Sequence, residues 1–475
     1  MVIKKRDEIE LEITGMAFGG RGITRHAGLA VFVDGAVPGD KVLARIIKKK
    51  KSYAEARALV IISPSSDRVD PPCPYSGSCG GCKWQFLSYG KQLEYKRQHV
   101  AEAIERIGGI SGVPVHPVIG SEKIFGYRNK MEFSCADRRW LLPHELGDPD
   151  IPPNIPIDFA LGLHVPGTFH KVLDMDACLI MPDSGSHILK QAGEWMKTSD
   201  LPPYGLRTQI GFWRFLMLRH SVAEDSWLVN IVTASEEKAE IEAFARQLYE
   251  SCDNVATVVN NVTSRKSSVA IGEYERVITG PGVLSEKLGK YHFDISANSF
   301  FQTNTRGAEK LYDIVAKFAE LTGVETVVDL YCGTGTIAIW LSELAASVVG
   351  IEINESAVSD AMQNCEKNGI ENCRFICGDI REVISGLSIH PDVMIIDPPR
   401  SGMHKDVVNA ILSLAPARIV YVSCNPATLA RDVELLAESY DIAEIQPVDM
   451  FPHTFHIEAV ARLEKKKEDK HGNFI

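Results

Sequence analysis

The sequence ETVVDLYCGTGT, residues 325–336, decides the fold class of the C-terminal half of this chain. Its apolar, β-branched first half predicts a buried strand, and its two glycines predict a tight turn that opens a helix. Glycines at the first strand-to-helix turn let the backbone approach a bound ligand closely. The stretch therefore predicts a sheet of the nucleotide-binding α/β type.

Acidic residues follow the next predicted strands. These strands are expected at residues 347–351, 373–377 and 393–396. They end at Glu352, at Asp379 and at Asp397. An acid about 20 residues after the glycine turn can accept both ribose hydroxyls of a nucleoside, and Asp379 is placed to meet an adenine edge. The dinucleotide fingerprint G-x-G-x-x-G is missing, so D-x-x-x-G-x-G with later acids favours S-adenosylmethionine.

A further strand, RIVYV at residues 418–422, is followed by Ser-Cys-Asn-Pro. Proline ends the ladder because it has no N–H to donate, which places Cys424 at the carboxyl end of a strand, where such sheets bind ligands. A cysteine there is either a packing residue or a nucleophile. The sequence Asp-Pro-Pro-Arg at 397–400 lacks the aromatic fourth residue that stacks a base in enzymes methylating exocyclic amines. A carbon target is therefore favoured, and a carbon target needs activation.

Cysteines also cluster in PPCPYSGSCGGC, residues 71–82. Cys73, Cys79 and Cys82 alternate with Gly and Pro, which rules out a regular helix or strand but allows the backbone to wrap a metal centre. Zinc and iron–sulfur clusters both take four thiolates, and Cys178 is the best candidate for the fourth. The spacing is not the Cys-x3-Cys-x2-Cys of radical S-adenosylmethionine enzymes, which tells against a redox role. Ligand number alone leaves zinc and a cluster open.

Short strands separated by Gly, Pro and Asp turns fill residues 1–64 and predict a five-stranded OB-type barrel. Over residues 1–60 there are 12 Lys and Arg against 7 Asp and Glu, whereas the whole chain carries a net charge of −11. The lysine run at 48–51 is expected in the hairpin between the last two strands, where it could reach phosphates. The alternative is a solvated turn of an inert barrel.

The chain of 475 residues is too long for one core and predicts two to four domains. Its composition, 45% hydrophobic and 24% charged, is that of a soluble globular protein without a membrane-spanning run. The N-terminus lacks the apolar core of a signal peptide, so a cytoplasmic location is expected. Eleven cysteines then indicate thiols and metal ligands, not a disulfide framework.

Taken together, the motifs resemble RNA uracil-C5 methyltransferases over nearly the whole chain. Residues 1–64 are similar to a TRAM domain, an RNA-binding variant of the OB barrel. The TRAM-like segment together with the cysteine motif marks the branch of the family that acts on 23S ribosomal RNA, because the bacterial tRNA branch usually lacks both. The other motifs that carry the resemblance are the stretches at residues 296–304, 329–335, 397–400, 423–426 and 456–458.

The resemblance implies a role for each candidate residue. Cys424 would be the nucleophile that adds to uracil C6, and Glu458 the base that removes the C5 proton. S-adenosylmethionine would be bound by Gln302, Tyr331, Glu352, Asp379 and Asp397. A 4Fe–4S cluster, in preference to zinc, would be held by Cys73, Cys79, Cys82 and Cys178.

Three other functions compete with this assignment. A tRNA uridine-C5 methyltransferase would use the same chemistry. An RNA cytosine-C5 methyltransferase usually carries a Pro-Cys motif, whereas residues 398–400 are Pro-Pro-Arg. A non-catalytic RNA-binding protein would have lost the nucleophile or the glycine turn, and both are intact.

The expected architecture is an α/β multidomain protein. Residues 1–64 form the barrel, residues 65–90 and 124–295 an α+β central domain with the iron–sulfur site, and residues 91–123 and 296–465 a Rossmann-like methyltransferase domain. Residues 466–475 are expected to be a flexible tail. The expected partner is ribosomal RNA, with neither a membrane nor an obligate protein partner, so a monomer is predicted.

Overall fold

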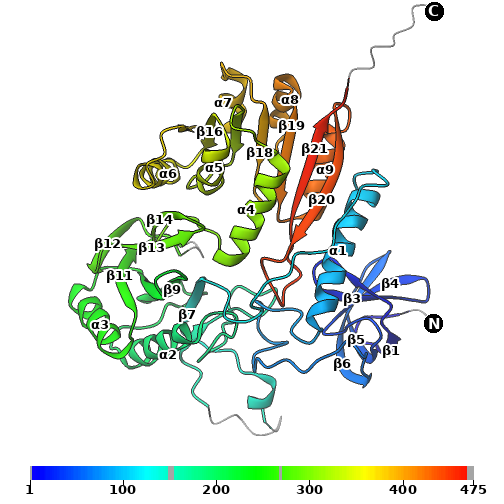
Figure 1. The fold of residues 1–475 in the computed structure, drawn as a ribbon. Coiled ribbons are helices and arrows are strands. Elements are labelled where there is room, and N and C mark those ends of the chain that lie inside the picture. The colour runs from blue at the N-terminus through cyan, green and yellow to red at the C-terminus, as the bar shows by residue number, and fades with distance from the viewer. Residues whose placement is uncertain (1–2, 148–154, 267–269, 468–475) are drawn as a thin grey trace, which may run out of the picture.

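The computed structural model describes residues 3–147, 155–266 and 270–467, and it places three large sheets in three separate parts of the chain (Figure 1). Most of the predicted tail, residues 468–475, lies outside the described residues. The division of the chain into domains at the boundaries given above stays a prediction. Each large sheet has its own apolar core.

The N-terminal sheet has six strands, so the expectation of five was wrong. The additional strand is the three-residue β2, because Gly19 and Gly20, at φ +96° and +85°, turn the chain back immediately after it. Alternate residues of β5 (Val42, Ala44 and Ile46) point into the core. The strands are β1 (Glu8–Glu12), β2 (Gly15–Ala17), β3 (Arg21–His26), β4 (Leu29–Asp34), β5 (Lys41–Lys49) and β6 (Tyr53–Ser63), in the order β1-β5-β6-β4-β3-β2.

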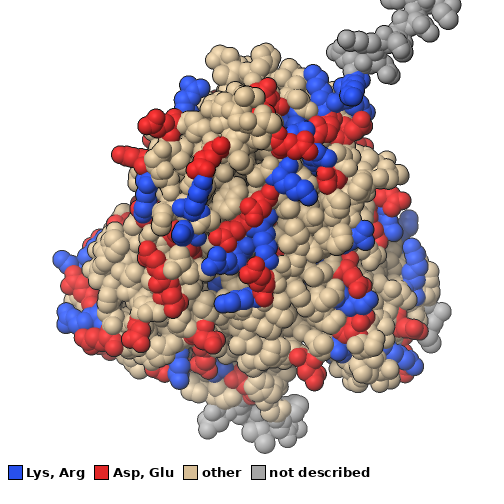
Figure 2. Space-filling model, in the orientation of Figure 1, with Lys and Arg blue, Asp and Glu red and all other residues tan. Residues whose placement is uncertain are grey.

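The lysine run lies in the β5–β6 hairpin, as predicted, with Lys50 N–H donating to Tyr53 O at 2.8 Å. Lys48 is paired with Glu55 at 3.1 Å, whereas Lys49, Lys50 and Lys51 are exposed. Figure 2 shows that, on the face drawn, Lys and Arg side chains are largely interspersed with Asp and Glu. On this face, an anionic partner would therefore meet mixed charge and no extended basic patch.

The central sheet is covered on one face by helices α2 (Asp183–Thr198) and α3 (Lys238–Ser251) (Figure 1). Leu189 of α2 and Phe244 of α3 share a core with Leu216 and Val229 of the sheet. A 3-10 turn, η1 (Pro143–Glu145), lies outside it. The strands are β7 (Lys130–Ala136), β8 (Ala160–Gly162), β9 (Trp213–Ser221), β10 (Ser226–Thr233), β11 (Val255–Val262) and β12 (Tyr274–Thr279), in the order β12-β11-β10-β9-β7-β8.

The C-terminal sheet has seven strands in the order β17-β16-β15-β18-β19-β21-β20, and only β21 runs antiparallel to its neighbours. The predicted parallel strands are confirmed: β15 is followed by the glycine turn, and the others are followed by, or end on, an acidic residue or Cys424. The strands are β15 (Thr326–Leu330), β16 (Ser347–Glu352), β17 (Cys373–Cys377), β18 (Val393–Ile396), β19 (Arg418–Ser423), β20 (Tyr440–Val448) and β21 (Glu458–Lys465).

Helices cover both faces of this sheet, as a parallel sheet requires. One face packs against Val100 of α1, Val407 of α8 and Leu429 of α9, and the other against Leu311 of α4 and Ala338 of α5. The covering elements are α1 (Tyr89–Arg106), α4 (Thr305–Ala319), α5 (Thr336–Leu341), η2 (Ser342–Leu344), α6 (Glu355–Lys367), α7 (Ile380–Val383), η3 (Ile384–Gly386), α8 (Lys405–Leu414) and α9 (Pro426–Leu436).

Two connections join the parts of the molecule. A hairpin of β13 (Val283–Leu288) and β14 (Tyr291–Ser296) leads from the central sheet into α4. After α1, the chain runs beside β20, where His116 N–H donates to Ile445 O at 2.9 Å. Within the described ranges, no helix is both long and apolar enough to cross a membrane.

Candidate active site

The glycine turn after β15 has the tight geometry that the sequence predicted. Gly333 and Gly335 have φ of +53° and +75°. A Cβ at position 335 would lie 2.8 Å from the Phe375 ring, so only glycine fits there without displacing that ring. Glu352, at the end of β16, accepts from Gly333 N–H at 3.1 Å and from Asn354 N–H at 2.9 Å. Its carboxylate is thereby held beside the turn.

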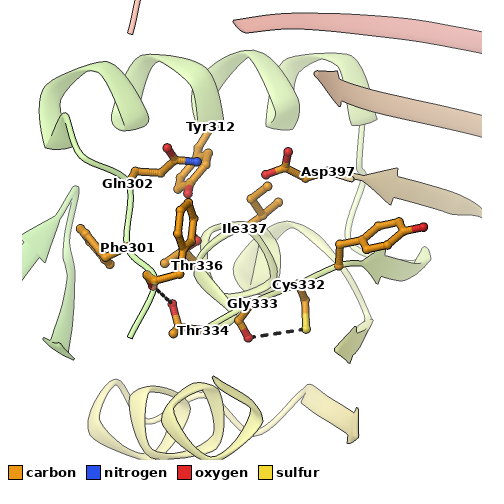
Figure 3. Close-up of a pocket in the computed structure, with 11 residues that line it drawn as sticks. Phe301, Gln302, Tyr312, Cys332, Gly333, Thr334, Thr336, Ile337 and Asp397 are labelled. Atoms are coloured by element: carbon orange, nitrogen blue, oxygen red, sulfur yellow. Dashed lines mark hydrogen bonds between the residues drawn. The ribbon is translucent and has the colours of Figure 1, made fainter. Parts of the chain in front are cut away.

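A pocket opens above this turn, between the start of α5 and the loop that precedes α4 (Figure 3). Gln302, Tyr331 and Asp397, three of the predicted cofactor residues, line it. In Figure 3 the side chains of Gln302 and Asp397 approach this space from opposite sides, from the loop before α4 and from the end of β18. The sheet therefore brings together residues that are about 95 positions apart in sequence.

The other two predicted cofactor residues do not line the pocket. Glu352 lies next to it through its bond to the turn. Asp379 follows β17, caps α7 and binds Arg381 through both carboxylate oxygens. These interactions with Arg381 lower the pKa of Asp379 to about 2. The side chain of Asp379 is thus engaged in a local ion pair.

Cys424 and Glu458 lie on adjacent strand ends. Strand β19 ends at Ser423, which pairs with Ala459 of the antiparallel β21. Cys424, the residue directly after β19, therefore comes opposite Glu458. Asn425 caps α9 through Ala427 N–H at 3.1 Å and donates to Arg400 O at 3.2 Å. The loop after β18 and the loop after β19 are therefore tied together.

The electrostatics of these side chains are coupled. Burial, together with the nearby Glu458 and Asp397 carboxylates, raises the pKa of the Cys424 thiol to about 11, although Arg400 acts to lower it. Burial also raises the pKa of Asp397 to about 7. Glu458 is only 6% exposed, and burial raises its pKa well above the ordinary value. A carboxylate with a raised pKa is a better proton acceptor near neutral pH than an exposed one.

Residues 449–457, between β20 and Glu458, are held by three other segments of the chain. Lys96 of α1 forms a fully buried ion pair with Asp449, with Nζ 2.6 Å from Oδ1. The N–H groups of Lys83 and Trp84 both donate to His453 O at 2.9 Å. Tyr127 of the central domain donates its hydroxyl to Pro452 O at 3.0 Å. This segment sets where β21, and hence Glu458, begins.

The four predicted metal-ligand cysteines line a second pocket, together with Leu163, Met175 and Ile180. Cys178 comes from the segment before α2, about a hundred residues beyond Cys82, and all four thiols are unbridged. Burial raises the pKa of Cys79 to about 11 and of Cys178 to about 12. In the described part of the chain, however, no group of three or more His, Cys, Asp or Glu side chains is placed so that it could hold a metal ion.

Several residues at the site were not predicted from the sequence. Tyr312 of α4 lines the cofactor pocket and bonds Thr336 at 2.9 Å. Phe300 lines the same pocket although it is 65% exposed. Asp329 is fully buried beneath the turn, and its pKa is raised well above the ordinary value by burial. Asp329 belongs to the D-x-x-x-G-x-G motif and could have been found there, whereas Tyr312 has no sequence signal beyond its place on an amphipathic helix.

Known proteins are similar to this chain in sequence and in fold. The family described as tRNA (Uracil-5-)-methyltransferase matches residues 275–466, and the TRAM domain matches residues 4–59. RNA methyltransferases of Chlorobaculum tepidum and Nitratidesulfovibrio vulgaris are 44% and 39% identical to this chain, with 97% of each chain covered in both cases.

A solved structure extends the likeness to the whole fold. The tRNA (uracil-54, C5)-methyltransferase of Pyrococcus abyssi, in complex with S-adenosyl-L-homocysteine, is 29% identical to this chain with a TM-score of 0.75. The match covers 96% of this chain and 100% of that one. With its glycine turn, strand-end acids and TRAM domain, the chain belongs to the S-adenosylmethionine-dependent RNA (uracil-5-)-methyltransferases.

Proposed function

We propose that this enzyme methylates C5 of a uridine in 23S ribosomal RNA through a covalent bond between Cys424 and uracil C6. The observation that carries the mechanism is the placement of Cys424 opposite Glu458, with Asp397 near enough to influence the pKa of the thiol. A half-buried thiol, a buried carboxyl of raised pKa and a cofactor pocket thus occupy one edge of the sheet.

The steps follow from the electronic structure of uracil. C5 of the neutral ring is a poor nucleophile, and addition of the Cys424 thiolate to C6 produces an enolate with electron density at C5. S-adenosylmethionine, when bound, would supply an electrophilic methyl group, and its sulfur would keep the electron pair of the broken S–CH3 bond and leave as S-adenosyl-L-homocysteine. C5 forms the new bond to that carbon, Glu458 accepts the C5 proton, and the Cys424–C6 bond breaks to restore the ring.

The pocket residues bind and orient the reactants. Gln302, Tyr331 and Asp397 line the space for the cofactor, and Glu352 beside the turn is available to ribose hydroxyls. Asp379 remains a proposed adenine contact, which requires its backbone or a remaining lone pair of the carboxylate that Arg381 binds. The exposed ring of Phe300 at the pocket provides a face on which a flipped base can stack.

A second candidate substrate is tRNA, because the match to the Pyrococcus abyssi enzyme covers 96% of this chain and that enzyme is described as a tRNA methyltransferase. Both substrates present an unpaired uridine to the same chemistry. The deciding experiment is to map 5-methyluridine in ribosomal and transfer RNA from a strain that lacks this gene. Loss of the modified base from 23S RNA alone supports the primary proposal, and loss from tRNA alone refutes it.

The four cysteines are proposed to hold a 4Fe–4S cluster. They share one pocket, carry no disulfide and are the thiolate set that such clusters take. Zinc would draw four sulfurs to about 2.3 Å from a single ion, whereas a cluster spreads the same four sulfurs around a larger body. The cluster is proposed in preference to zinc because of the resemblance to the ribosomal-RNA branch of the family.

The proposed contribution of the cluster is structural. Lys83 directly follows Cys82, and its N–H and that of Trp84 hold His453 O. Ordering the cysteine segment therefore also orders the segment that leads to Glu458. Protein purified without oxygen should be coloured and contain iron, and a colourless protein that contains zinc in place of iron would refute the cluster.

A further inference from the structure

A group of exposed aromatic, apolar and basic side chains lies on the central domain, outside the site described above. It is built from the chain after β7, the hairpin after β8 and the loop before β9 (Figure 1). The group, here called the loop surface, consists of Trp140, Phe169, His170, Lys171, Arg207 and Ile210.

Direct contacts join these residues into one surface. The Lys171 ammonium lies 3.6 Å from the centre of the Trp140 ring, and Trp140 N–H donates to Val172 O at 2.7 Å. Arg207 contacts His170 Nε2 at 2.6 Å, and the Phe169 and His170 rings have centroids 5.0 Å apart. The surface is thus continuous over segments that are separated by up to 70 positions in sequence.

The backbone beneath the loop surface is ordered by hydrogen bonds. Val165 N–H donates to Lys171 O at 2.9 Å, which closes the hairpin that carries Phe169. Gly205 N–H donates to Ile210 O at 2.8 Å, which closes the loop that carries Arg207. Leu206 packs against Val172, so the two loops share an apolar anchor. Phe169 and Ile210 nevertheless remain 64% and 75% exposed.

The charge of the loop surface is positive, although the chain as a whole is acidic. Among the described residues, Lys171, Arg207 and the neighbouring exposed Arg138 outnumber the exposed acids of the adjoining segments, Asp137 and Asp158, while Arg139 and Glu145 neutralise each other at 2.6 Å. His170 carries little charge near neutral pH, because partial desolvation and the adjacent Arg207 and Lys171 lower its pKa. Aromatic faces interleaved with cations are the pattern that binds single-stranded nucleic acid.

We propose that the loop surface binds unpaired nucleotides of the substrate RNA. Bases stack on Phe169 and Trp140, and Arg207 and Lys171 contact the backbone. The proposal rests on methylation of a uridine, which must leave its stack to meet Cys424 and therefore has accessible neighbours. Duplex RNA hides its base faces, so the exposed aromatic rings favour a single strand.

The test uses the full-length protein and a fluorescent oligouridylate, with duplex RNA of equal length for comparison. The double variant Phe169→Ala/Arg207→Gln should lose about tenfold in affinity for the single strand, from one stacked base and one phosphate contact. Its affinity for S-adenosylmethionine should not change. The matched control is Tyr249→Ala/Arg246→Gln on α3, two exposed positions on another face, and it should bind RNA like the wild type.

Crosslinking gives a readout that does not depend on affinity. Irradiation of an oligonucleotide containing iodouridine should attach it to the peptides that contain Phe169 or Trp140. Equal oligouridylate binding by the double variant and the control would overturn the proposal, and so would crosslinks that avoid both peptides. Methyl transfer to RNA by the same preparations separates the role of the loop surface from the proposed function. A double variant that is active and binds RNA like the wild type refutes only the role of the loop surface. A wild-type protein that does not methylate RNA refutes the proposed function.

Discussion

Replacing Lys96 with Met tests whether the segment before Glu458 is held by a buried charge. Lys96 and Asp449 are both fully buried, and Lys96 Nζ lies 2.6 Å from Asp449 Oδ1 and 3.0 Å from Phe451 O. Without the ammonium, Asp449 keeps only the Tyr89 hydroxyl at 2.9 Å and Phe451 N–H at 3.0 Å. An unpaired buried charge lowers the free energy of unfolding by about 3–5 kcal/mol. Because two donors to Asp449 remain, we expect Lys96→Met to lower it by about 3 kcal/mol.

A pair on the same helix provides the control. Lys91 and Glu94 are also 2.6 Å apart, but their side chains are 34% and 64% exposed. Lys91→Met should therefore cost at most about 1 kcal/mol. The double variant Lys96→Met/Asp449→Asn should recover more than half of the stability that Lys96→Met loses, because the asparagine retains a hydrogen-bond acceptor but carries no charge.

The assay is urea denaturation monitored by tryptophan fluorescence. Trp84 reports on this segment, because its side chain is fully buried and its backbone N–H donates to His453 O. With slopes of about 1–3 kcal/mol per molar urea, Lys96→Met should lower the midpoint by about 1 M or more. Hydrogen exchange at the Lys83 and Trp84 amides should accelerate in parallel. A midpoint equal to that of Lys91→Met would refute the reasoning, since burial would then contribute nothing to the pair.

The remaining predictions concern chemistry, cluster and RNA. Cys424→Ala should abolish methyl transfer while leaving cofactor affinity nearly unchanged, and turnover at the wild-type rate would contradict the mechanism. Glu458→Gln should leave a covalent protein–RNA adduct that survives denaturing electrophoresis, because the C5 proton is no longer removed. The rate of alkylation of the Cys424 peptide, measured by mass spectrometry, should rise about tenfold per pH unit until the pH reaches the thiol pKa of about 11. Arg400→Gln should raise this pKa, and Glu458→Gln should lower it. An unchanged pH profile in both variants would show that these two charges do not influence the thiol. Cys178→Ser should reduce the iron content and weaken the fold of the segment before Glu458, and unchanged iron would remove it from the ligand set. Deleting residues 1–64 should weaken RNA binding and reduce its salt dependence, and an unchanged salt slope would count against the barrel.

The positions of the parallel strands along the chain and the residues at their ends were accessible from sequence. Buried parallel strands are short apolar runs, and Gly333, Asp397 and Cys424 stand directly after such runs. The cofactor turn needed no tertiary information, because its glycines impose their own backbone geometry. The sixth strand of the barrel was missed because a three-residue strand has too few residues to show alternation.

The catalytic arrangement itself depended on tertiary structure. Glu458 comes opposite Cys424 only because β21 is inserted antiparallel between β19 and the edge strand β20, and no local pattern encodes that pairing. Asp379 stands at the predicted strand end, yet its partner Arg381, two residues later, takes up the carboxylate. Sequence by itself determined which residues end each strand, because that depends on short-range periodicity and turn chemistry. Only the fold decided which of them meet, because pairing, burial and charge coupling act between residues that are distant in the chain.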